Sequence, residues 1–281
     1  MAAPIASAIF SSCLQQPSNR KTVDWNPSLY RRYEDERTRP AVELLGRVPL
    51  ASASLALDLG CGPGNSTELL VQRFPTAQVI GIDNSPAMLR SAAERLPQVR
   101  FELADVASWV PEPRDRPDLI FANATLQWVP DHPRLLPRLF SLLAPGGVLA
   151  IQMPDNSEEP TRRLMRELAG HAPWNALLGE ADYARTQLLR IQDYYDLLVK
   201  EAARVDVWHT IYQHPMASPA AIVEWLQATG LRPYIAPLSP ELRASFLAEY
   251  ERRIAAAYEP RADGRRLLAF PRIFIVAQRR P

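Results

Sequence analysis

The first half of the chain contains a short segment in which an acidic residue is followed by closely spaced glycines. Asp58 follows the apolar residues 55–57 and precedes Gly60, Gly62 and Gly64. Glycine adopts positive φ angles and lets the backbone approach a ligand closely, particularly ahead of a helix N-terminus. The segment therefore predicts a nucleotide-binding loop between a strand and a helix.

The spacing of the glycines indicates which kind of nucleotide the loop holds. A dinucleotide-binding loop has the pattern G-x-G-x-x-G, and its third glycine position is occupied here by Asn65. The pattern present is instead Asp-x-Gly-x-Gly-x-Gly. Cys61 within it is interpreted as a small residue packed in a tight turn, not as a nucleophile. The predicted ligand-binding residues of the loop are Asp58, Gly60, Cys61, Gly62 and Gly64.

Further polar residues follow the next apolar stretches. Asp83 ends the stretch 78–83, where a carboxylate can accept hydrogen bonds from both hydroxyls of a ribose. The stretches 99–103 and 119–122 are also followed by polar residues. Ligands of parallel α/β sheets bind at the carboxyl ends of the strands, so these positions converge. The predicted cofactor residues there are Asp83, Asn84, Asp105, Val106 and Asn123.

Strands and helices alternate along the chain in a way that could position these residues. Strands are predicted at 54–58, 78–83, 99–103, 119–122, 148–152, 205–212 and 272–277. Helices are predicted at 27–39, 41–48, 65–74, 86–95, 134–143, 219–229 and 240–258, with Asn65 or Ser66 capping the third. This order predicts an α/β fold of the Rossmann-like type, a seven-stranded, mostly parallel sheet with helices on both faces. Residues 154–203 depart from the alternation and predict a helical insertion, a candidate lid over the strand ends.

Composition narrows the function classes. The chain has 281 residues and a net charge of +1, from 32 basic and 31 acidic side chains. Balanced charge gives no field that would recruit nucleic acid or an anionic membrane. Scattered arginine pairs such as Arg162-Arg163 are interpreted as solvated faces. No apolar run approaches the roughly 20 residues that span a bilayer.

Two features bear on domains and compartment. Two cysteines cannot build a disulfide framework and indicate a reducing compartment, so we expect a cytoplasmic protein. Residues 1–22 contain no acid, and their positive charges follow the apolar part, the reverse of a signal peptide. We therefore expect a disordered extension at 1–22 and one domain over 23–281.

The glycine loop resembles the first motif of class I S-adenosylmethionine-dependent methyltransferases. A narrower resemblance, from about residue 24 to the end of the chain, is to the trans-aconitate 2-methyltransferase family. Its most specific parts are Leu-Gln-Trp at 126–128 and Met-Pro-Asp-Asn at 153–156; the others lie at 24–30, 58–67 and 268–272. The resemblance implies methyl transfer from S-adenosylmethionine to one carboxylate of trans-aconitate, which gives a monomethyl ester. It also implies that Asp105 accepts from the adenine amino group, Asn123 meets the methionine part and Asp58 accepts from its ammonium.

This chemistry requires few specialised groups. A carboxylate is already ionised at pH 7, so it attacks a sulfonium methyl without a general base. We accordingly predict no catalytic acid or base and no metal ligand. The enzyme has to align the reactants and exclude water, and alignment alone can contribute roughly 7–11 kcal/mol.

A small tricarboxylate, the expected substrate, needs groups that hold its charges. Arginine suits this task because its fork of donors matches a carboxylate. Residues just after the fourth strand, in the insertion and near the N-terminus could border the same substrate. The predicted substrate residues are Tyr30, Gln127, Trp128, His132, Tyr195, Arg232 and Arg272. The enzyme is expected to act as a monomer.

Other functions remain possible at this stage. A carboxyl methyltransferase acting on another small or carrier-bound acid would have the same loop, although a carrier protein would favour a basic patch. A nicotinamide-dependent oxidoreductase is disfavoured by Asn65 and by the lack of a Tyr-x-x-x-Lys pair. Nucleic-acid methylation is disfavoured by the charge and by the lack of an Asn-Pro-Pro-Tyr-like motif. A regulator that binds the cofactor without catalysis would be excluded by a turnover assay.

Overall fold

The computed structural model describes residues 34–111, 116–178, 186–227 and 230–281. The predicted extension at 1–22 and the predicted substrate residue Tyr30 lie outside these ranges. Within the described parts of the chain, no helix is long and apolar enough to cross a membrane.

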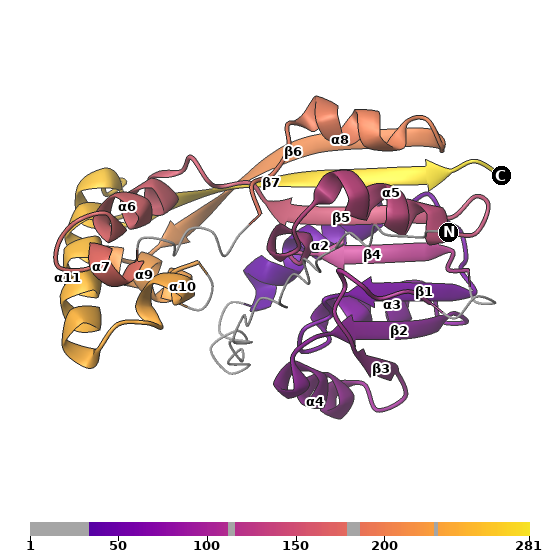
Figure 1. Cartoon of the computed structure of the whole chain (residues 1–281), viewed down its shortest axis with the longest axis horizontal. Coiled ribbons are helices and arrows are strands. Elements are labelled where there is room, and N and C mark those ends of the chain that lie inside the picture. Colours follow the sequence, from indigo (N-terminus) through magenta and orange to yellow (C-terminus); the bar gives the residue numbers. More distant parts are fainter. Residues whose placement is uncertain (1–33, 112–115, 179–185, 228–229) are drawn as a thin grey trace, which may run out of the picture.

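A seven-stranded sheet forms the centre of the molecule (Figure 1), and its order is β3-β2-β1-β4-β5-β7-β6. The strands are β1 (Leu55–Leu59), β2 (Gln78–Asp83), β3 (Arg100–Leu103), β4 (Leu119–Asn123), β5 (Val148–Pro154), β6 (Ala202–Met216) and β7 (Arg266–Arg279). The first five strands pair in parallel, and β7 runs antiparallel between β5 and β6. The predicted seven-stranded, mostly parallel α/β sheet is confirmed.

Helices cover both faces of this sheet. They include α2 (Glu34–Gly46), α3 (Asn65–Arg73), α4 (Pro86–Arg95), α5 (His132–Leu142) and α8 (Ile191–Leu198). Alternate residues of a strand point to opposite faces. Leu119 and Phe121 of β4 accordingly join one buried apolar cluster, whereas Ile120 and Ala122 join the other. The central strands are thus buried on both sides, which holds their carboxyl ends in a fixed arrangement.

The structure differs from the predictions at the first described helix. Separate helices were predicted before and after Pro40, but α2 is one helix that contains this proline. The proline was therefore a wrong signal for a helix start. The buried residues Ala41, Leu44, Leu45 and Val48 belong to one of the two apolar clusters. Their burial against the sheet holds α2 in place.

The last two strands are much longer than predicted. Pairing between β5 and β7 ends at Pro154 and Arg272, whereas β6 and β7 remain paired as far as Met216 and Arg266. A two-stranded ribbon therefore extends past the end of β5 (Figure 1). Pro215 lies within this extension, and β6 is an edge strand, where proline is tolerated.

Helices of the described residues gather at the far end of this ribbon, and we call them the helical layer (Figure 1). They are α6 (Pro160–Ala169), α7 (Asn175–Leu178), α9 (Pro219–Gln227), α10 (Arg232–Ile235) and α11 (Pro240–Ala257). The Tyr250 hydroxyl of α11 donates to the Thr161 carbonyl of α6 at 2.9 Å, and Trp174 Nε1 donates to the Leu242 carbonyl at 3.1 Å. These bonds join segments that lie far apart in the sequence.

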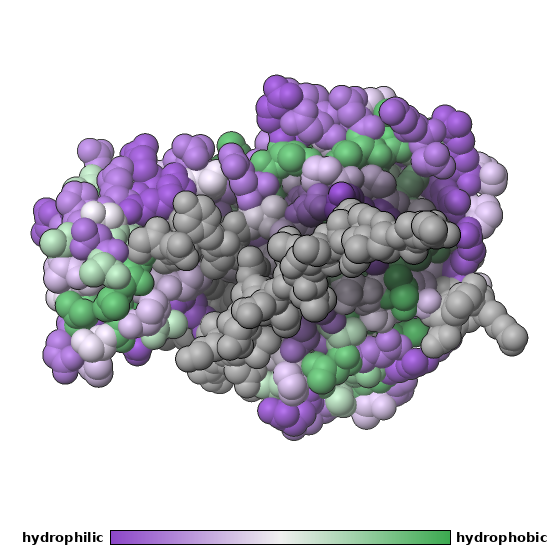
Figure 2. Space-filling view, viewed as in Figure 1, coloured by the Kyte–Doolittle hydropathy of each residue, from purple (hydrophilic) through white to green (hydrophobic). Residues whose placement is uncertain are grey.

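The segment predicted as one insertion, 154–203, has parts in two places. Helices α6 and α7 belong to the helical layer, whereas α8 packs against α5 and β6 on the central sheet. The surface over α8 is largely hydrophilic (Figure 2). Whether the helical layer acts as a lid stays a prediction.

Candidate active site

The glycine loop joins β1 to α3, and its three glycines all have positive φ angles, +67° at Gly60, +55° at Gly62 and +93° at Gly64. They serve different purposes. A Cβ atom on Gly60 would overlap the side chain of Thr125, whereas a Cβ on Gly62 would meet no atom of the described residues within 4 Å. Gly60 therefore permits close packing, and Gly62 borders open space that a ligand could occupy.

Asp58 lies beneath this loop and is fully buried. Its Oδ2 accepts hydrogen bonds from the hydroxyls of Ser66 at 2.7 Å and Thr67 at 2.6 Å. Its Oδ1 is buried without a hydrogen-bond partner among the described residues. Burial raises the pKa of Asp58 to about 6, although both hydroxyl donors lower it. The carboxylate thus fixes the start of α3 and has one oxygen that can accept from a bound ligand.

The predicted helix cap was wrong. Gly64 occupies the N-cap position of α3, and no side chain of the described residues accepts a capping hydrogen bond there. The hydroxyl of Ser66 donates to Asp58 instead. The first N–H groups of α3 are thus not satisfied by a capping side chain, and such N–H groups attract negatively charged ligand atoms.

Asp83 connects the end of β2 to the glycine loop. Its Oδ2 accepts from the Gly62 backbone N–H at 2.9 Å, and its Oδ1 accepts from the Ser85 N–H at 2.8 Å. Burial raises the pKa of Asp83, and these N–H groups oppose the shift. A carboxylate has about four acceptor positions, so Asp83 can hold the loop and still accept from a sugar hydroxyl. Asn84 follows it directly.

The ends of β3 and β4 carry the remaining predicted cofactor residues. Asp105 Oδ1 accepts from the Ala107 N–H at 2.9 Å, and Val106 is buried. Asn123 Oδ1 is buried and has no hydrogen-bond partner in the described structure. Asn123 also lines a small cavity of about 30 Å³ together with residues of the glycine loop. The structure therefore brings Asn123 together with Gly60, Cys61 and Gly62.

Cys61 lies in the same loop, and its thiol is buried. Burial, together with the nearby carboxylates of Asp58 and Asp83, raises the pKa of this thiol. A protonated thiol is a weak nucleophile. The environment of Cys61 therefore suits packing in the turn.

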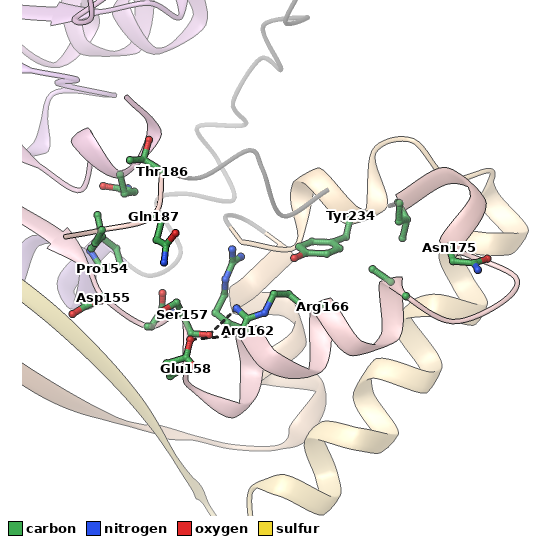
Figure 3. A pocket seen from close by; sticks show the side chains of 16 residues that line it. Pro154, Asp155, Ser157, Glu158, Arg162, Arg166, Asn175, Thr186, Gln187 and Tyr234 are labelled. Atoms are coloured by element: carbon green, nitrogen blue, oxygen red, sulfur yellow. Dashed lines mark hydrogen bonds and ion pairs between the residues drawn. The ribbon is translucent and has the colours of Figure 1, made fainter. Parts of the chain in front are cut away.

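A much larger cavity, of about 600 Å³, lies between the end of β5 and the helical layer (Figure 3). Gln127 and residues 154–158 line it on the sheet side, and Arg162, Arg166 and Tyr234 line it on the side of the helical layer. Gln127 lies in a short 3₁₀ helix, η1 (Leu126–Trp128), that follows β4, only four residues after Asn123. The segment after β4 therefore contributes Asn123 to the glycine-loop cavity and Gln127 to the large cavity.

Arg162 and Arg166, two of the three arginines of α6, were missed as site residues in the sequence. The interpretation of Arg162-Arg163 as a solvated pair was wrong for Arg162, which is only 5% exposed. Its Nη1 donates to the Gly230 carbonyl at 3.1 Å. Arg162 lies in the buried stripe of α6 with Met165 and Ala169, at the spacing of one helix face. This spacing in the sequence could have indicated that Arg162 is buried.

Only some of the predicted substrate residues lie near the large cavity. Among those that the structure describes, Gln127 lines it, and Arg232 begins α10 two residues before the lining residue Tyr234. Gln127 Nε2 donates to the Ala124 carbonyl at 2.6 Å, and its Oε1 is buried without a partner within the described ranges. Trp128 is half-buried beside it but does not line the cavity.

Three other predicted residues have different surroundings. His132 is buried at the start of α5, where Nδ1 lies 2.7 Å from the Tyr194 hydroxyl and Nε2 lies 2.9 Å from the Leu126 carbonyl. Because a carbonyl only accepts, Nε2 carries the proton and Nδ1 accepts from the tyrosine; burial lowers the pKa of this histidine. Tyr195 is 44% exposed. The structure brings neither His132 nor Tyr195 to the cavity lining.

Arg272 is also buried, but in the core where β7 passes β5. Its Nη1 donates to Gln152 Oε1 at 3.2 Å, and its guanidinium lies 4.8 Å from the centre of the Phe270 ring. It does not line the large cavity. Its surroundings suit a role in joining the ribbon to the sheet.

Comparisons with known proteins agree with this geometry. Residues 56–147 match the model of a methyltransferase domain. A putative methyltransferase from Bacillus halodurans C-125 superposes with a TM-score of 0.55 at 14% identity, covering 86% of this chain and 100% of that one. The sheet order and the acidic glycine loop are those of class I S-adenosylmethionine-dependent methyltransferases.

Relatives of much higher identity narrow this class. A trans-aconitate 2-methyltransferase from Variovorax paradoxus (strain S110) is 69% identical over 92% of this chain and 99% of its own length. One from Paracidovorax citrulli (strain AAC00-1) is 66% identical over 91% of this chain and 98% of its own. The chain belongs to the trans-aconitate 2-methyltransferase family.

Proposed function

We propose that the protein transfers the methyl group of S-adenosylmethionine to one carboxylate of trans-aconitate, giving the monomethyl ester and S-adenosylhomocysteine. The observation that carries this proposal is the 69% identity to a trans-aconitate 2-methyltransferase over 92% of the chain. The geometry supports it, because Asn123 lines the glycine-loop cavity and Gln127, four residues further along the chain, lines a larger cavity that contains arginines.

The residues around the glycine loop fit the cofactor. S-adenosylmethionine, when bound, supplies a methyl group on a positively charged sulfur. Asp58 and Asn123 each have a buried Oδ1 without a partner in the described structure, and these oxygens would accept from the ammonium of the methionine part. Asp83 would accept from the ribose hydroxyls, and Asp105 would accept from the adenine amino group beside Val106. The open space at Gly62 leaves room for the ligand.

The protein contributes alignment and exclusion of water. The substrate carboxylate is ionised at neutral pH, so no side chain has to remove a proton before attack. The walls of the large cavity would orient one carboxylate oxygen in line with the methyl carbon and sulfur, and orientation of this kind is worth roughly 7–11 kcal/mol. Gln127 and Trp128 are proposed to border the reacting carboxylate because they follow the strand that carries Asn123.

The setting of the enzyme belongs to the same proposal. We propose that it acts as a monomer in the cytoplasm. A single chain contains both cavities, so turnover would not need residues from a second copy. The chain has only two cysteines, and Cys61 is a free, buried thiol, which suits a reducing compartment.

A methyl-transfer assay tests the proposed reaction. Methyl-labelled S-adenosylmethionine would be incubated with the protein and trans-aconitate, cis-aconitate, citrate or isocitrate in parallel. The expected result is base-labile label with trans-aconitate well above the others, since esters release methanol in base. Cofactor binding without transfer to trans-aconitate would contradict the proposed substrate. Transfer to another small or carrier-bound acid would instead support the alternative carboxyl methyltransferase.

A further inference from the structure

The groups that hold the two unreacting carboxylates of the substrate can be assigned from the large cavity. We propose that Arg162 and Arg166 of α6 bind these carboxylates and thereby select a polycarboxylate. This inference rests on the proposed function. It concerns side chains from the helical layer, whereas the methyl donor would occupy the glycine loop.

The spacing of the two arginines suits a compact polyanion. They lie four positions apart on one helix, so their Cβ atoms are about 5–6 Å apart and their side chains share a face. Each guanidinium has a planar fork of donors that can pair with both oxygens of a carboxylate. Figure 3 shows Arg162 directed into the cavity between Gln187 and Tyr234. Two adjacent carboxylates could thus contact two adjacent forks.

The environment of Arg162 makes its contact strong. Its side chain is buried, and its Nη1 is oriented by the Gly230 carbonyl. Interactions between charges strengthen when water is excluded from them. A fixed, buried guanidinium would therefore discriminate sharply between a carboxylate and a neutral group.

The surroundings of Arg166 would let a substrate carboxylate replace its present ion-pair partner. It donates to the Ser157 carbonyl at 2.8 Å, and its Nη2 lies 3.7 Å from Glu158 Oε1. The Glu158 side chain is 89% exposed, so this ion pair is weak. A substrate carboxylate could replace Glu158 at small cost.

The other carboxylate among the described lining residues, that of Asp155, has a different partner. Asp155 Oδ2 lies 2.8 Å from His209 Nε2, and Figure 3 shows Asp155 pointing away from Arg162. Among the described lining residues, Glu158 is therefore an acidic side chain that opposes an anionic substrate at Arg166. Its removal should have an effect of opposite sign to removal of Arg166.

The test compares steady-state kinetics of four variants with trans-aconitate. Arg162→Gln and Arg166→Gln should each raise KM roughly ten- to a hundredfold, because a charge-assisted hydrogen-bond pair is lost, while the Kd of S-adenosylmethionine stays unchanged. Arg166→Lys should recover part of the loss. Glu158→Gln should lower KM a few-fold, because it removes a competing carboxylate.

Arg163→Gln provides a matched control on the same helix. The Arg163 side chain is 57% exposed, and its Nε lies 3.6 Å from Glu167 Oε1, outside the cavity lining. Its KM should equal that of the wild type. If the wild type methylates trans-aconitate and the kinetics of Arg166→Gln equal those of Arg163→Gln, this inference is overturned. The proposed function would still stand. Failure of the wild type to methylate trans-aconitate would overturn the proposed function itself.

Destabilisation is separated from substrate binding by further measurements. Arg162→Gln removes a buried hydrogen bond to the Gly230 carbonyl, so its thermal unfolding is measured alongside its kinetics. Arg166 is more exposed and gives the cleaner kinetic comparison. A monocarboxylate such as crotonate supplies a second readout. The wild type should methylate crotonate poorly, and Arg166→Gln should methylate it about equally poorly. The preference for trans-aconitate over crotonate should therefore fall by the same factor by which the KM of trans-aconitate rises.

Discussion

The glycine-loop side of the sheet and the helical layer are built in different ways. Around the glycine loop, functional side chains lie at the carboxyl ends of strands β1, β2 and β4, and short hydrogen bonds such as those from Ser66 and Thr67 to Asp58 fix them. In the large cavity, Arg162 comes from a helix at the far end of a ribbon, and its guanidinium is oriented by Gly230, 68 residues away in sequence. One region is assembled at the ends of adjacent sheet strands, and the other depends on how the helical layer positions α6.

The difference indicates how each region is expected to respond to change. The cofactor region should tolerate substitutions in the helical layer, because its hydrogen bonds are made within the glycine loop and the neighbouring strands. The substrate region should respond to substitutions in the contacts between α6 and α11, since these fix the position of α6. The following predictions test this separation.

The largest effect is expected for Gly60→Ala. Its Cβ would overlap Thr125, and the positive φ angle adds strain, so the free energy of unfolding should fall by about 2–5 kcal/mol. Gly62→Ala should cost only the strain, about 1–2 kcal/mol, yet should abolish most S-adenosylmethionine binding, because its Cβ enters open space in the site. Denaturant titration and calorimetry measure the two quantities.

Gly146→Ala is the control for strain alone. Gly146 has a φ angle of +77° and open surroundings in the turn before β5, away from the site. It should lose as much stability as Gly62→Ala and bind the cofactor normally. Equal cofactor affinity in both variants would contradict the proposed role of Gly62.

Asp58→Asn should weaken S-adenosylmethionine binding roughly ten- to a hundredfold. It replaces a charged acceptor by an amide, and hydrogen bonds to charged groups are worth about 1.5–3 kcal/mol. Asp118→Asn is the control at the opposite end of β1, where Asp118 Oδ2 accepts from the Ser54 N–H at 2.6 Å and the Leu55 N–H at 3.1 Å. It should lower stability and leave the Kd unchanged.

The pH dependence of binding follows from the same residue. The pKa of Asp58 is raised from 3.8 to about 6 in the folded protein, so the carboxyl takes up a proton as the pH falls through 6. The affinity for S-adenosylmethionine should therefore decline, by at most about tenfold per pH unit for one group, between pH 7 and 5. The raised pKa of Asp83 acts in the same direction. A Kd that does not vary with pH would contradict this role of the carboxylates.

Stability has the opposite pH dependence at Asp58. An acid whose pKa is raised by folding stays protonated in the native state while the unfolded state ionises. Its contribution to stability therefore decreases as the pH rises from about 4 to 6. Asp58→Asn should flatten this part of the profile, measured as the thermal midpoint against pH in the absence of cofactor.

The smallest effect is expected at the tyrosine pair of α8. Tyr194→Phe removes the hydrogen bond to His132 and should lower the free energy of unfolding by about 0.5–1.5 kcal/mol without changing KM. Tyr195→Phe should leave stability unchanged, because Tyr195 is exposed. Tyr195 does not line the large cavity. A rise in KM for Tyr195→Phe would nevertheless support its predicted contact with the substrate.

The sequence by itself determined the sheet and the position of the cofactor region. Strands buried on both faces appear as short apolar runs, and the loop between β1 and α3 needs its glycines for local backbone reasons, so both are visible in a single sequence. Asp58, Asp83 and Asn123 could be predicted because each is a polar residue at the carboxyl end of an apolar strand. The hydrogen bonds that each makes, and the oxygens left without partners, required the structure.

Only the tertiary structure decided how the large cavity is lined and how long the last two strands are. The ribbon continues past β5 because β6 and β7 pair with each other over residues far apart in sequence. Arg162 and Arg163 are neighbours of the same type, yet one is buried in the cavity and the other is exposed. Their difference arises from the face that α6 turns toward Gly230 and α11. A contact of this kind depends on segments that the local sequence does not contain.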